Sequence, residues 1–135
     1  MIDPSIGFAG SLILTLLFLG LAVNTGLQAK RAKHFFAVGA SVLMLVATIY
    51  FALGLGELYD LEAAGWITPV HMKMARVNTA AYLLPVATGI ATLRNPRRRK
   101  LHGRVAFLIL FFTICTAATG TLMLLWSTPL ETVAP

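Results

Sequence analysis

The distribution of charge is the feature that most constrains what this chain can fold into. Four long runs, residues 4–29, 34–56, 77–93 and 105–130, contain no Asp, Glu, Lys or Arg. A helix that crosses a bilayer needs roughly 20 mainly apolar residues, so three runs qualify directly and the shorter one qualifies if its helix begins near Ile67. The sequence therefore predicts an all-α integral membrane four-helix bundle. Its helices are expected at about 6–27, 34–56, 67–93 and 103–127.

The composition supports a membrane protein and excludes other classes. Hydrophobic residues make up 58% of the chain and charged residues 12%. In soluble domains about half of the residues are apolar and about a quarter are charged. This balance excludes a disordered chain and an ordinary soluble enzyme, and we expect no nucleic-acid partner in spite of the net charge of +6. The apolar runs hold no carboxylate, which argues against a proton-coupled transporter. We interpret residues 1–135 as one transmembrane domain with the lipid bilayer as its first partner.

The basic and acidic residues fall at opposite ends of the predicted helices. Nine of the eleven Lys and Arg residues lie in or directly after two short connections, 28–33 and 94–102, and all five acidic residues lie on the other side. The positive-inside rule then puts the basic loops in the cytoplasm. We therefore expect an N-out/C-out, multi-pass protein.

Glycines and one outer segment suggest how the helices pack. Small residues allow close helix approach, so we expect the stripe around Gly10 and Gly20 to pack against another protein helix, within or beyond the bundle. In the outer segment 57–66, the spacing predicts a short interfacial helix, with Trp66 at the depth of the lipid headgroups.

The three histidines each open a predicted helix. His34 and His102 follow the two basic loops, so they begin different helices at the same depth, whereas His71 begins the 67–93 helix from the opposite face. Two imidazoles on facing helices suit the axial positions of a haem iron, while zinc or copper would need further ligands that are not evident. We expect one haem b near the cytoplasmic face, with Arg99 and Arg104 near its propionates. The alternative is that both imidazoles only anchor helix ends at the headgroups.

The opposite end of the 67–93 helix carries a second group of polar residues. His71, Asn78 and Tyr82 share half a helix face, with Arg76 nearby but off that face. These residues are a candidate site for a quinone headgroup or an anion. The alternative for Arg76 is that it reaches out to the headgroups.

Two resemblances add to this interpretation. The stretch LHGRVAFLILFFTICTAATG, which contains His102 and the pair Thr119-Gly120, resembles the last core helix of small membrane b-type cytochromes of the cytochrome b-561-like superfamily. The stretch AKHFFAVGA, with His34, resembles another core helix of that family. In its two-haem members alternate helices pair, which implies that His34 and His102 hold one haem. The partner that His71 would need is missing, because the first helix contains no His.

The second resemblance is to bacterial four-helix proteins linked to haem–copper oxidase assembly. The basic-loop His34, the mid-helix Pro85 and Thr119-Gly120 match their pattern, but Arg76 stands where their third helix would carry a His. Together these likenesses imply a bacterial cytoplasmic (inner) membrane.

The resulting hypothesis is a membrane b-type cytochrome that relays electrons through one bis-histidine haem. The alternative is a cofactor-free structural or assembly subunit of a larger respiratory or photosynthetic membrane complex. Because the charge and glycine patterns suit both, we expect membrane-protein partners in either case and leave enzymatic activity open.

Overall fold

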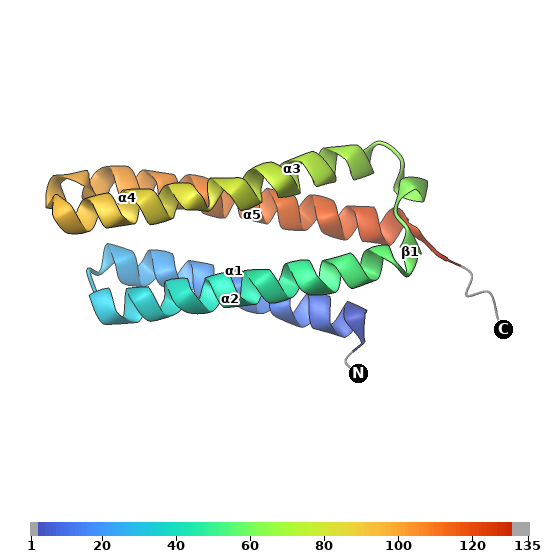
Figure 1. Cartoon of the computed structure of the whole chain (residues 1–135), viewed down its shortest axis with the longest axis horizontal. Coiled ribbons are helices and arrows are strands. Elements are labelled where there is room, and N and C mark those ends of the chain that lie inside the picture. The colour runs from blue at the N-terminus through green and yellow to red at the C-terminus, as the bar shows by residue number, and fades with distance from the viewer. Residues whose placement is uncertain (1–2, 131–135) are drawn as a thin grey trace.

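The computed structural model describes residues 3–130, and its architecture is almost entirely helical (Figure 1). The α-helices are α1 (Pro4–Leu27), α2 (Arg31–Gly56), α3 (Ile67–Ala81), α4 (Leu83–Arg94) and α5 (Arg99–Trp126). Two 3-10 turns, η1 (Glu62–Ala64) and η2 (Pro96–Arg98), and two short strands, β1 (Tyr59–Asp60) and β2 (Thr128–Pro129), complete the described chain.

The predicted 67–93 helix is present but interrupted. α3 and α4 run end to end along α5, with Tyr82 between them in a turn conformation (Figure 1). Pro85 follows three residues later, and its missing N–H removes one helical hydrogen bond, which is a common cause of such a break. The result is four helical rods. Three continuous helical stretches, Pro4–Leu27, Arg31–Gly56 and Pro96–Trp126, are each long and apolar enough to cross a membrane.

The rods form two hairpins. α1 packs mainly against α2, and α5 packs mainly against α3 and α4, while the hairpins meet mostly through α1 and α5 (Figure 1). Both basic connections lie at one end of the molecule, and β1 lies at the other with the beginning of α1 and the end of α5 (Figure 1). Acidic residues of the described chain, Asp3, Glu57, Asp60 and Glu62, accordingly lie at the end opposite the basic one.

Unlike in a soluble protein, many of the buried side chains are small or polar and many large apolar side chains are exposed. The most buried side chains between α1 and α2 are small or carry hydroxyls, such as Ala37 at 0% and Thr15 at 1% exposure. Thr15 and Thr48 share a hydrogen bond of 3.2 Å across the hairpin. Large apolar side chains such as Phe36 and Leu53 face outward. Close packing of small residues with hydroxyl bridges is typical of helices that associate in lipid.

The glycines of α1 divide into two kinds. A Cβ on Gly7 would clash with the ring of Phe51, and one on Gly26 would approach His34, so these two glycines permit close packing. Gly10 and Gly20 have nothing within 4 Å of such a Cβ. Both are exposed on the outer face of α1, so the part of the expectation that placed them against a helix within the bundle is not met, and packing against a helix beyond the bundle stays a prediction.

The segment 57–66 forms less helix than its apolar spacing predicts. Asp60 Oδ1 accepts a hydrogen bond from the Glu62 N–H at 3.0 Å and starts η1, and Gly65, with φ of 70°, ends it after one turn. β1 pairs antiparallel with β2, so that the segment is tied to the end of α5. The rings of Trp66 and Trp126 pack edge to face beside it, with centroids 6.4 Å apart.

Candidate histidine sites

The fold brings His34 and His102 together at the basic end of the molecule. His34 lies in the first turn of α2 and His102 in the first turn of α5, so each hairpin contributes one imidazole. Their ring centroids are 6.0 Å apart and their planes are nearly perpendicular, at 87°. The pairing expected from their common depth is therefore present in the structure.

Hydrogen bonds fix the protonation of both rings. His34 Nδ1 lies 2.8 Å from the Ala22 carbonyl oxygen, which can only accept, so Nδ1 carries the proton. Thr88 Oγ1 donates its hydrogen to the Leu84 carbonyl, and it therefore accepts from His102 Nδ1–H at 3.1 Å. In both rings Nε2 is left with a free lone pair, which is the form in which a histidine binds a metal.

Glycines make room for both imidazoles. A Cβ on Gly26 of α1 would lie 3.2 Å from His34 Nδ1, and one on Gly89 of α4 would lie 3.4 Å from His102 Cε1. Both glycines follow a threonine, as Gly120 does. Of the three Thr-Gly pairs, only Thr119-Gly120 was recognised from the sequence. The other two could have been found from the repetition of this dipeptide in the predicted helices.

Two arginines were expected near the haem propionates. Arg99 Nη2 donates to the carbonyl oxygens of Gly26 and Leu27, at 2.9 and 3.1 Å. It thereby caps the C-terminus of α1 and links the hairpins next to His34. Arg104 is exposed and forms no hydrogen bond within the described chain. In this structure Arg99 is therefore engaged, whereas Arg104, two residues after His102 on α5, lies on the opposite side of that helix.

The geometry fits a metal that takes two protein ligands. Because a metal–imidazole bond is about 2 Å long, two axial imidazoles on one ion place their ring centroids roughly 6 Å apart. The two ring planes meet edge to face at 87°. Within residues 3–130 no group of three or more His, Cys, Asp or Glu side chains could hold a metal ion. Haem iron needs only two ligands from the protein, whereas zinc needs four.

The four residues of the expected outer site do not form one cluster. His71 Nδ1 lies 3.1 Å from Thr119 Oγ1. Asn78 Nδ2 and the Tyr82 hydroxyl instead both contact Thr113 Oγ1, at 3.1 and 2.8 Å, about two turns deeper. Arg76 is exposed and takes part in neither contact.

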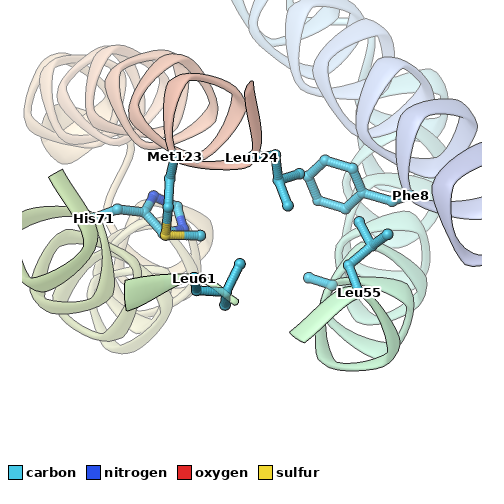
Figure 2. A pocket seen from close by; sticks show the side chains of 8 residues that line it. Phe8, Leu55, Leu61, His71, Met123 and Leu124 are labelled. Carbon is cyan, nitrogen blue, oxygen red and sulfur yellow. The ribbon is translucent and has the colours of Figure 1, made fainter. Parts of the chain in front are cut away.

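His71 lines a cavity at the strand end of the molecule. Figure 2 shows His71, Leu61 and Met123 of one hairpin facing Phe8 and Leu55 of the other, with Leu124 between them. Phe8 and Leu124 could not be predicted as wall residues from the sequence, because neither residue type signals a site by itself.

No family model, no curated protein and no solved structure matches this chain.

Proposed function

We propose that this protein is a membrane b-type cytochrome with one haem held between His34 and His102. When bound, the haem supplies single-electron redox chemistry, and the protein relays electrons between a donor and an acceptor. The observation that carries this proposal is the pair of imidazoles 6.0 Å apart, each with Nδ1 hydrogen-bonded.

The chain's own residues have distinct tasks in this proposal. His34 and His102 would hold the haem iron through their Nε2 lone pairs. The Ala22 carbonyl and Thr88 hold each ring in the required orientation, and Gly26 and Gly89 leave space for it. Arg99 keeps the two hairpins, and hence the two ligands, at a fixed separation.

The proposed setting is a bacterial cytoplasmic membrane that the chain crosses four times, N-out and C-out. Three long apolar helices support this setting, and α3 with α4 would supply the fourth crossing beside α5. The basic end, which carries the histidine pair, would then face the cytoplasm.

The test is the reduced-minus-oxidised absorption spectrum of the protein expressed with ample haem supply. Wild type should show a low-spin b-type α-band. His34→Ala and His102→Ala should each abolish it, because each removes one of two axial ligands. His71→Ala is the matched control and should retain the band, since His71 lies at the other end of the molecule.

Two results would contradict the proposal. Loss of the band in His71→Ala but not in His102→Ala would show that the pairing is wrong. A wild-type protein without haem would instead favour the cofactor-free structural or assembly subunit.

A further inference from the structure

The basic end of the molecule carries positive charge that the chain itself does not neutralise. Each hairpin contributes one basic connection to this end (Figure 1). The acidic residues within 3–130 lie around β1 and at the start of α1, at the other end (Figure 1). The cationic side chains of the two connections are all exposed and have no carboxylate near them in the described chain: Lys30, Arg31 and Lys33 in the first, and Arg94, Arg97, Arg98, Arg99 and Lys100 in the second.

The two connections lie close enough to repel each other. His34 and His102 are in the first turns of α2 and α5, and their ring centroids are 6.0 Å apart, so the beginnings of these helices are neighbours. Charges interact over about 8 Å at physiological ionic strength. Within the described chain, the two bonds of Arg99 are the only side-chain hydrogen bonds between the α1–α2 hairpin and the α3–α5 hairpin. The hairpins are therefore weakly joined at the end where like charges push them apart.

We propose that an anionic phospholipid with two phosphates binds across both connections and holds the hairpins together. Phosphate oxygens accept strong, charge-assisted hydrogen bonds from guanidinium and ammonium groups. In a diphosphatidylglycerol headgroup, two phosphates are joined through one glycerol. One phosphate contacts the cations of the first connection and the other contacts those of the second, while Arg99 keeps its bonds to α1. The lipid thereby replaces a repulsion between the hairpins with an attraction of each hairpin to one headgroup.

The surroundings of the connections favour a lipid over a soluble phosphate compound. Only residues 28–30 separate α1 from α2, and only a short segment with η2 separates α4 from α5, so the cations follow directly on apolar helices. In a membrane that these helices cross, the cations lie at the depth of the headgroups. Large apolar side chains next to them are exposed: Leu27, Phe35, Leu93 and Leu101. Acyl chains can cover these side chains, which a soluble anion cannot do.

The lipid site goes beyond the proposed haem function and does not depend on it. It uses cationic side chains outside the apolar helices and leaves the Nε2 atoms of His34 and His102 untouched. Protein without haem should therefore bind the lipid as well, and either proposal can fail without the other.

The experiment titrates tetraoleoyl diphosphatidylglycerol into the full-length protein in a neutral maltoside detergent. The rise in Tm with lipid concentration gives Kd. The emission of Trp66 and Trp126, the only two tryptophans and both near β1, follows unfolding without touching the site. Wild type should gain a few degrees. It should bind phosphatidylglycerol, with one phosphate, roughly tenfold more weakly, and phosphatidylcholine should give no shift.

Charge neutralisation in either connection tests the bridge. Each of two triple variants should lose the preference for two phosphates over one, because one half of the site remains. Each should also be at least as stable as wild type in lipid-free detergent, because it removes repulsion. The variants are Lys30→Gln/Arg31→Gln/Lys33→Gln and Arg97→Gln/Arg98→Gln/Lys100→Gln. The matched control neutralises the two basic residues outside this end, Lys73→Gln/Arg76→Gln, and should respond to lipid as wild type does.

Three results would overturn the proposal. The first is a full preference for the two-phosphate lipid in either triple variant, and the second is an equal loss of response in the Lys73/Arg76 control. The third is an equal rise in Tm with inorganic phosphate or pyrophosphate, which would show a site for soluble anions. A measurement on wild type alone covers a variant that does not fold. Its lipid response should shrink when NaCl is raised from about 0.05 M to about 0.5 M, and a response independent of salt would exclude a site built from charge.

Discussion

At the scale of single residues, the hydrogen bond between Thr88 and His102 offers a sensitive test of the haem site. Thr88→Val keeps the side-chain shape but removes the acceptor for His102 Nδ1–H. The imidazole becomes a poorer electron donor to ferric iron, so the midpoint potential should rise by on the order of tens of millivolts. A redox titration of the α-band measures this. Thr92→Val is the matched control, because Thr92 bonds only the Thr88 carbonyl of its own helix, and an equal shift there would contradict the assignment.

The residue scale also shows how far sequence alone reaches. His34 and His102 could be paired from depth, since both begin helices after basic loops. The partners of their Nδ1 atoms, Ala22 and Thr88, could not be predicted, because these contacts depend on which helices face each other and at what height. Arg99 illustrates the same limit. Its position in the sequence suggested a contact with a haem propionate. In the structure its guanidinium instead donates to a carbonyl oxygen at the C-terminus of α1, and the sequence does not show that this helix end lies beside it.

At the scale of elements, the tight turn between α1 and α2 contains an unfavourable residue. Ala29 has φ of 56°, a left-handed conformation that costs an L-residue roughly 1 kcal/mol and suits glycine. Ala29→Gly should therefore stabilise the protein by about 0.5–1 kcal/mol, and Gly65→Ala, at φ of 70°, should destabilise it by about 1 kcal/mol. Unfolding in mixed micelles with increasing SDS measures both. Destabilisation by Ala29→Gly would show that this turn relaxes to another conformation.

Element boundaries followed from charge more readily than from any other signal. α2 and α5 begin within the basic connections that interrupt the apolar runs, and their C-terminal ends lie at the predicted positions to within one residue. Pro85 causes the interruption at Tyr82. The proline is visible in the sequence, but the interruption could not be predicted, because neighbouring helices decide whether a proline breaks a membrane helix. The β1–β2 pair joins residues that are distant in sequence, and two-residue strands leave no alternating pattern to detect.

At the scale of the whole molecule, the two hairpins carry the same arrangement. In each, a Thr-Gly pair in the first rod makes room for the histidine that begins the second rod, Gly26 for His34 and Gly89 for His102. The sequence alone did not reveal this repeat, because the connections differ in length and most of each helix is interchangeable apolar residues. The two ends then diverge. The basic end holds two neighbouring imidazoles, while the strand end holds His71 opposite Phe8, so the two ends of the molecule differ in chemistry.

The orientation of the molecule in the membrane gives the last prediction. Both basic connections lie at one end of the molecule, and β1, two residues before Glu62, lies at the other (Figure 1). The positive-inside rule therefore predicts that Pro96 is in the cytoplasm and Glu62 outside. In a background with Cys115 replaced by Ala, Glu62→Cys should react with an impermeant maleimide added to intact cells. Pro96→Cys should react only in inverted vesicles. The parent without cysteine is the blank. Labelling of both positions from the same side would mean that α3 and α4 do not cross the membrane together. The chain would then cross three times, and His34 and His102 would lie at opposite membrane faces.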